Sequence, residues 1–185
     1  EDLKRYGLSV PVDQTKLTGK LTKLDKKVFY TPGFDAIFIP GRAADAGIIT
    51  SQLNFHDMKV PFLGANGWNS PDFARTDDSS IDGAVFVDGF FAESTTPTVQ
   101  DFVARYKKRF EANPTLFAMQ GYDAAKLVLD AVRKGADSGE TVRDQLLTQQ
   151  DLSSLTGPAA FGPDGTLNRP VFLIQIKRGR LTQVN

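Results

Sequence analysis

Residues 34–70 read FDAIFIPGRAADAGIITSQLNFHDMKVPFLGANGWNS, and this stretch decides the fold class. The apolar run of residues 34–39 has no helical gap, which is typical of a parallel strand buried on both faces. A helix is predicted from Ala43, and residues 60–64 form a second apolar run. The apolar stripe of this helix is assigned to Ile48, Ile49, Leu53 and Phe55. A strand, a helix and a strand in this order indicate an α/β fold with a parallel sheet.

Polar and aromatic residues follow both predicted strands. Arg42 comes after the first strand, and Asn66, Trp68 and Asn69 come after the second. Small ligands bind at this edge of open α/β sheets. An arginine can hold a carboxylate by two hydrogen bonds, and a tryptophan offers a flat apolar wall. The alternative is that Trp68 packs the turn and that Asn66 with Gly67 only supplies a left-handed backbone conformation.

Composition bounds the class of protein. The chain has 185 residues, of which 41% are hydrophobic and 24% charged, as in a soluble globular protein of one domain or two small ones. The 22 basic and 22 acidic residues balance, so nothing favours a nucleic acid or an anionic membrane as partner. Cysteine is absent, and no signal peptide is recognised. The chain opens in what looks like the middle of a helix, so a mature or truncated product is expected.

The sequence offers little to catalysis. Its one histidine, His56, is predicted in a solvated turn, and no Gly-x-Ser-x-Gly elbow or glycine-rich phosphate loop occurs. The acidic residues Asp77, Asp78 and Asp82 are interpreted as a solvated face of a loop. We therefore predict a protein that is not an enzyme and that has no catalytic residues, metal site or cofactor.

The remaining pattern places helices between two α/β portions. Residues 8–12 are predicted as a strand, residues 16–30 as an amphipathic helix, and residues 83–91 as a central strand. Residues 98–150 carry three helical stripes in succession. Residues 171–176 form a strong strand that leads into a terminal hairpin.

An ordered series of motifs carries a family resemblance. DAIFIPGRAADAGIITSQL, VPFLGANGWNSPDF, GAVFVDGFF, FVARYKKRFEANPTLFAMQGYDAAKLVLDAV and TGPAAFGPDGTLNRPVFLIQIKRGRL follow one another along the chain. Together they resemble the carboxyl-terminal part of a type I periplasmic solute-binding protein of the kind that serves branched-chain amino acid transporters. GANGWNSPDF and LFAMQGYDAA are most similar to a subset known as penicillin-binding protein activators.

The resemblance implies two Rossmann-like or flavodoxin-like lobes that close on a ligand. Residues 1–90 would belong to the second lobe, residues 91–152 to the helical part of the first lobe, and residues 153–185 would return to the second lobe as a hairpin. No counterpart of the first-lobe sheet is present, so the fold is expected to be incomplete. The implied ligand-binding residues are Arg42, Ala43, Asn66, Trp68, Asn69, Met119, Gln120 and Tyr122.

The resemblance predicts an extracytoplasmic solute-binding protein of an ABC importer, either periplasmic or an outer-surface lipoprotein. Its partners would be a small-molecule ligand and a membrane permease or envelope protein. The ligand is expected to be an amino acid or another small molecule. Asn66 stands where amino-acid binders place an acidic residue, which argues against an ordinary α-amino acid, and Arg42 would suit an anionic ligand. The alternative is a ligand-free interaction module that regulates cell-wall synthesis. The apolar stripe of residues 98–150, with Leu127, Leu129 and Val132, is expected to be exposed or to form a homodimer.

Overall fold

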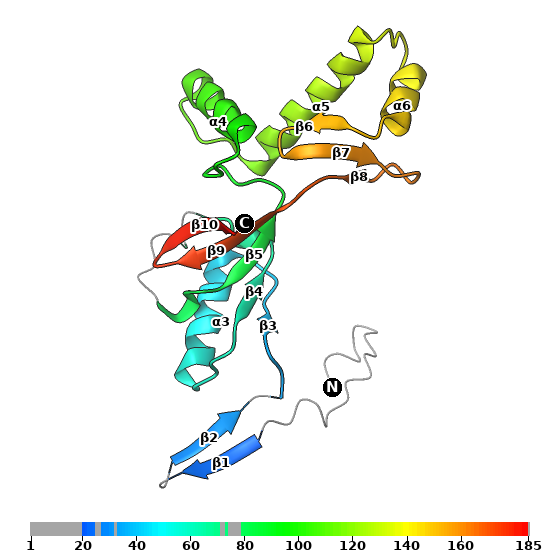
Figure 1. Ribbon diagram of the computed structural model, residues 1–185. Coiled ribbons are helices and arrows are strands. Elements are labelled where there is room, and N and C mark those ends of the chain that lie inside the picture. Colours follow the sequence, from blue (N-terminus) through cyan, green and yellow to red (C-terminus); the bar gives the residue numbers. More distant parts are fainter. Residues whose placement is uncertain (1–19, 25–26, 32, 71–72, 74–78, 185) are drawn as a thin grey trace.

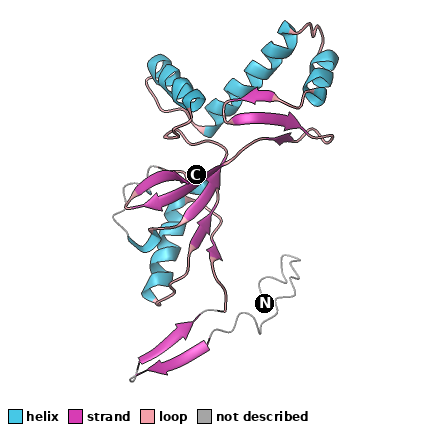
Figure 2. Ribbon diagram, in the orientation of Figure 1, coloured by secondary structure: helices cyan, strands magenta, loops and turns pink. Residues whose placement is uncertain are grey.

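The structure, a computed structural model, describes residues 20–24, 27–31, 33–70, 73 and 79–184. Figures 1 and 2 show two bodies above a separate two-stranded hairpin. We call the body formed by the described residues of 33–88 and by residues 172–184 the sheet lobe, and the body formed by residues 97–168 the helical lobe. The strand predicted at residues 8–12 lies outside the described residues.

A five-stranded sheet forms the sheet lobe in the order β10-β9-β5-β4-β3. Strands β3 (Ile37–Phe38), β4 (Phe62–Gly64) and β5 (Val85–Asp88) are parallel, with Ile37 opposite Phe62 and Leu63 opposite Val85. Strand β9 (Phe172–Lys177) runs antiparallel to β5 and turns into β10 (Arg180–Val184). The predicted parallel strands and the terminal hairpin are confirmed.

Helix α3 (Ala43–Phe55) lies along one face of this sheet (Figure 1). It begins where the sequence predicts, but its buried face is different. Ala43, Ala46 and Thr50 are buried, whereas the side chains of Ile48 and Phe55 are 68% and 80% exposed. Of the predicted apolar stripe only Leu53 packs against the core. Ile48, Ile49 and Phe55 are exposed, because the spacing of residues 43, 46 and 50 turns small side chains toward the sheet.

Trp68 lies in the core of the sheet lobe, not on its surface. It ends the short helix η1 (Asn66–Trp68) and is 0% exposed, with Phe73 and Phe86 at ring-centroid distances of 5.5 and 6.3 Å. A Cβ atom at Gly64 would overlap the indole, so glycine makes room for it. Trp68 is expected from the sequence to form an apolar wall of the ligand site, with packing of the turn as the alternative. Its burial supports the alternative.

Of the predicted helix at residues 16–30, the residues that the structure describes, 20–24 and 27–30, form strands instead. Strand β1 (Lys20–Leu24) pairs antiparallel with β2 (Lys27–Thr31), so that Thr22 lies opposite Phe29. The sequence of β2, KVFYT, consists mainly of β-branched and aromatic residues, which favour strands. Helical spacing of the leucines therefore misled the prediction.

The helical lobe contains the three predicted helices and a sheet that was not predicted. Helices α4 (Pro97–Phe110), α5 (Leu116–Arg133) and α6 (Gly139–Thr148) are followed by a three-stranded antiparallel sheet. Its strands are β6 (Leu152–Ser154), β7 (Gly157–Phe161) and β8 (Leu167–Asn168). The structure places residues 152–168 beside α5 and α6 (Figure 1), whereas the predicted boundary assigns residues 153–168 to the second lobe and only Leu152 to the first.

The new sheet changes which side of α5 is exposed. Leu127, expected to face water, is buried against Leu152 and Ala159. Leu129 and Val132 are 54% and 51% exposed, as expected of that stripe. The face of the five-stranded sheet opposite α3 is also partly open. Homodimerisation through residues 98–150 remains a prediction.

Two crossovers, residues 89–96 and 169–171, join the lobes, and one apolar core extends through the first of them. Phe90 and Phe91 of the first crossover share this core with Val99, Phe102 and Met119 of the helical lobe. Because the core is continuous across the junction, the position of the helical lobe depends on packing as well as on the chain connection.

Polar groups at the junction are bonded to one another. The Asp123 carboxylate accepts a hydrogen bond of 2.9 Å from the Leu155 N–H, and Thr98 donates one of 2.9 Å to the Leu155 carbonyl. Arg169 of the second crossover reaches the same carboxylate at 3.7 Å and donates to the Met119 sulfur at 3.2 Å. Burial raises the pKa of Asp123, against the opposing effects of the Leu155 hydrogen bond and the charges of Arg169 and Lys126.

We expect the Trp68→Ala substitution to lower the free energy of unfolding by about 3–5 kcal/mol, because it removes a fully buried aromatic ring and leaves a cavity. Urea denaturation measures this change. The matched control is Phe55→Ala, which removes an exposed ring and should change stability by less than about 0.5 kcal/mol. Equal effects of the two substitutions would contradict the buried position of Trp68.

The raised pKa of Asp123 leads us to expect that the stability of the fold depends on pH. Since its pKa is raised in the folded protein, the folded state holds this proton more tightly than the unfolded state. The resulting stabilisation is complete below the ordinary pKa of 3.8 and is lost as the pH rises through the raised pKa. The unfolding free energy of the wild type, relative to Asp123→Asn, should therefore decrease as the pH rises from this value.

The matched control for this pH series is Asp164→Asn. Hydrogen bonds from Thr166 lower the pKa of Asp164, so its contribution is lost as the pH falls through the lowered pKa. The two variants should thus give pH slopes of opposite sign in parallel unfolding experiments. Slopes of the same sign would show that the environment of Asp123 differs from the one described.

Candidate ligand-binding site

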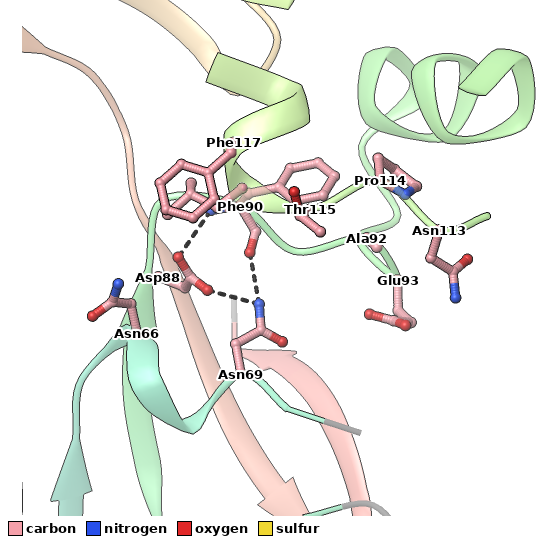
Figure 3. Close-up of a pocket in the computed structure, with 11 residues that line it drawn as sticks. Asn66, Asn69, Asp88, Phe90, Ala92, Glu93, Asn113, Pro114, Thr115 and Phe117 are labelled. Carbon is pink, nitrogen blue, oxygen red and sulfur yellow. Dashed lines mark hydrogen bonds between the residues drawn. The ribbon is translucent and has the colours of Figure 1, made fainter. Parts of the chain in front are cut away.

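A cavity of about 430 Å³ lies between the sheet lobe and the beginning of the helical lobe. It is formed by the carboxyl-end loops of β4 and β5, the first crossover, and the loop and first turn that open α5 (Figure 3). Its lining consists of Asn66, Asn69, Asp88, Phe90, Ala92, Glu93, Asn113, Pro114, Thr115, Leu116 and Phe117. The parallel strands thus bring their carboxyl ends to a cavity, as the ligand-binding edge of an open α/β sheet does.

A closed set of hydrogen bonds shapes the floor of this cavity (Figure 3). The Asn69 side-chain amide donates to the Asp88 carboxylate at 2.7 Å and to the Phe90 carbonyl at 2.9 Å. The Phe90 N–H in turn donates to the other Asp88 oxygen at 3.3 Å. These bonds fix the loop after β4 against the end of β5, so the two strand ends keep one geometry.

The charge of the described lining is negative. Asp88 is 5% exposed and Glu93 is exposed, and the lining contains no lysine or arginine. Among the described residues, Asp88 accepts hydrogen bonds only from neutral groups and forms no ion pair. The cavity is therefore suited to a group that brings hydrogen-bond donors or positive charge.

The structure brings only two of the eight predicted site residues, Asn66 and Asn69, to the cavity. Arg42 caps the start of α3, where its guanidinium donates to Asp45 at 3.0 and 3.2 Å. This pair lies in solvent, with the Arg42 side chain 83% exposed, and its hydrogen bonds lower the pKa of Asp45. Trp68 lies in the core, as described above.

The other four predicted residues do not line the cavity. Ala43 and Met119 are buried, and Gln120 is exposed. The half-buried Tyr122 packs on Phe102, with 4.9 Å between the centroids of the two rings. The Tyr122 hydroxyl accepts a hydrogen bond of 3.2 Å from Arg105. Helix α5 reaches the cavity through its first turn, which contains Leu116 and Phe117, because the helix begins at the N-cap Thr115 beside it.

Sequence reasoning missed Asp88, the central polar residue of the lining. The sequence pattern did contain a signal for Asp88. Asp88 and Gly89 follow the apolar residues of β5, just as Asn66 follows shortly after the apolar residues of β4. The predicted strand was extended to residue 91, whereas β5 ends at Asp88. Phe90 and Phe91 leave the sheet because they pack into the junction core.

The other features of the described residues that bear on function lie away from this cavity. A further cavity of about 550 Å³ lies at the opposite edge of the sheet, near Lys59 and Asp82. His56 is exposed at the end of α3, as predicted. Within the described ranges, no group of three or more potential metal ligands occurs. Among the helices that the structure describes, none has the length and apolar character needed to cross a membrane.

Solved structures share this fold. A putative branched-chain amino acid ABC transporter protein from Rhodospirillum rubrum matches 81% of this chain with 25% identity and a TM-score of 0.74, over 44% of its own length. The binding protein LivJ from Streptococcus pneumoniae, solved with isoleucine, matches 82% of the chain with 25% identity, a TM-score of 0.59 and 44% of its own length.

A solute-binding protein from R. palustris in complex with benzoate has 18% identity and a TM-score of 0.58, over 81% of this chain and 42% of its own. At this identity the match shows the fold alone. The chain thus spans less than half the length of these three proteins.

The family model of the periplasmic binding proteins matches residues 32–180. The predicted α/β class with a parallel sheet, as a partial type I periplasmic binding fold, is confirmed by this match and by the structure from R. rubrum. The family consists of extracytoplasmic solute-binding proteins, which are not enzymes. On a match that covers most of its length, this chain belongs to the periplasmic binding protein family.

Proposed function

We propose that this chain forms one wall and the hinge of the solute site in an extracytoplasmic binding protein that serves an ABC importer. The observation that carries the proposal is the cavity at the carboxyl ends of β4 and β5, bounded on its other side by the start of α5. Its volume of about 430 Å³ lies within the range of small-molecule sites.

The chemistry of the lining supports a small organic solute. Phe90, Leu116 and Phe117 supply apolar surface, while Asn66 and Asp88 supply polar atoms on the facing side. A mainly apolar pocket with a few placed polar groups both retains and orients a ligand. A module that had lost its ligand would be expected to fill this space with its own side chains, so the open cavity favours solute binding.

The position of the cavity also supports a site that responds to lobe movement. The lining comes from both lobes and from the first crossover between them. A solute that contacts both sides would stabilise one relative position of the lobes, since a ligand shifts a conformational equilibrium by its difference in affinity. We propose that a membrane permease reads this position. We further propose a periplasmic or outer-surface location, the latter as a lipoprotein.

A thermal-shift series tests the proposal on the purified protein, with branched-chain and other amino acids, aliphatic amines, dicarboxylates and benzoate as probes. A solute that binds the cavity should raise the melting temperature. At 100 times its dissociation constant it adds about 2.7 kcal/mol to the free energy of unfolding.

Two phenylalanines make a matched pair of variants for this series. Phe117 and Phe55 are both 80% exposed, so replacing either by alanine should cost little stability, but only Phe117 lines the cavity. We expect Phe117→Ala to weaken the ligand-induced shift and Phe55→Ala to leave it unchanged. No shift with any probe class, or equal shifts in both variants, would argue against a solute site here.

A further inference from the structure

We propose that Arg169 is a positioning residue of the solute site. Its guanidinium holds the second crossover against α5 and the first crossover, and so keeps the two walls of the cavity in one relative position. Arg169 itself lies outside the cavity lining. This inference rests on the proposed function and adds a residue that controls the site without contacting the solute.

Contacts with α5 are the first observation. The Arg169 side chain is 14% exposed, and its guanidinium donates a hydrogen bond of 3.2 Å to the Met119 sulfur. It also lies 3.7 Å from Oδ2 of Asp123, which is buried and accepts no hydrogen bond from the described residues. Met119 and Asp123 are one turn apart and lie on the same face of α5. The second crossover is therefore tied to the helix whose first turn lines the cavity.

The same guanidinium lies beside the first crossover. A Cβ atom at Gly89 would come within 3.0 Å of Nη2 of Arg169 and 3.4 Å of Cδ1 of Leu116, so glycine leaves room for both side chains. Gly89 stands between Asp88 and Phe90, which both line the cavity, as Leu116 does. Arg169 thus packs against the segment of the first crossover that forms part of the cavity wall.

The shape of the guanidinium suits this position. It is planar and always charged, with its donors in a fixed fork, whereas a lysine offers one charged point on a flexible chain. Because its contacts belong to α5 and to the first crossover, they restrain the lobes in addition to the chain connection. Without them the lobes would sample several relative positions. Only the fraction of molecules with both walls in place would bind, and the apparent affinity falls with that fraction.

A distance measurement between the lobes tests the proposal without a ligand. The chain has no cysteine, so Gln52→Cys on α3 and Glu140→Cys on α6 add two exposed sites for spin labels, one in each lobe (Figure 1). Pulsed electron paramagnetic resonance then gives the distribution of the distance between the labels. We expect a narrow distribution with Arg169 and a broader one with Arg169→Met, which removes the charge and the fork.

The matched control is Arg133→Met, which removes an exposed arginine that pairs with Asp130 on α5 at 3.2 Å. It should leave the distribution narrow. Equal widths in Arg169→Met and Arg133→Met would overturn the proposal.

Arg169→Lys separates positioning from the supply of a charge. Lysine can still pair with Asp123, so we expect it to restore most of the stability in urea that Arg169→Met loses. The distribution should nevertheless stay broad, because one ammonium cannot reproduce the contacts of the fork. If lysine also restores the narrow distribution, the charge alone is sufficient and the assignment to the guanidinium is wrong.

Gly89→Ala alters the same contact from the other side. Gly89 has no positive φ, so alanine fits its backbone, but the new methyl group has to displace the guanidinium. We expect a broader distribution in the presence of Arg169 and little further change in Arg169→Met, since contacting residues are not additive. Gly121→Ala, whose Cβ atom would meet nothing within 4 Å, is the control.

An effect of Gly89→Ala that is the same in both backgrounds would contradict the contact. If Arg169→Met does not fold, Gly89→Ala decides alone, and a distribution as narrow as that of Gly121→Ala would overturn the proposal.

Calorimetric titration with leucine and with benzoate links the lobe position to the solute site. For a probe that the wild type binds, we expect at least about tenfold weaker binding in Arg169→Met, and no change in Arg133→Met. Unchanged or tighter binding in Arg169→Met would overturn the role of Arg169 in the site. If the wild type binds neither probe, the proposed function fails for these solutes, while the width of the distance distribution still decides whether Arg169 positions the lobes.

Discussion

The junction between the lobes is the constraint on which the rest of the structure depends. The chain crosses it twice, and the first crossover runs through an apolar core that contains Phe90, Val99 and Met119. Hydrogen bonds to carboxylates that enter this core offset part of the cost of burying them, because an unpaired buried polar group is costly. Asp88 and Asp123 each accept a backbone N–H for this reason, from Phe90 and Leu155 respectively.

The same constraint creates the candidate site. Where β5 ends, the backbone turns away so that Phe90 and Phe91 can pack into the junction, which leaves Asp88 at the floor of a cavity. Asn69 closes the set by bonding both Asp88 and the Phe90 carbonyl. The residues that fix the first crossover against the sheet are therefore also the polar residues of the proposed solute site, so a substitution at one of them would affect both.

Membership of the periplasmic binding protein family and the geometry of the cavity are independent observations, and both support the proposed binding of a small solute. The family match concerns the pattern of the whole chain, whereas the cavity concerns a few side chains at one sheet edge. The related proteins bind solutes as different as isoleucine and benzoate, so the fold leaves the ligand open.

The sequence by itself determined the elements whose patterns are local: the parallel strands, the start of α3, the three helices and the terminal hairpin. It also identified the sheet edge at Asn66 and Asn69, because strand ends are visible in the order of apolar and polar residues. Only the tertiary structure decided which side chains that edge presents. It buried Trp68 over Gly64, paired Arg42 with Asp45 and brought Asp88 to the cavity. These outcomes depend on contacts between residues far apart in the chain, and such contacts leave no periodic signal in the sequence.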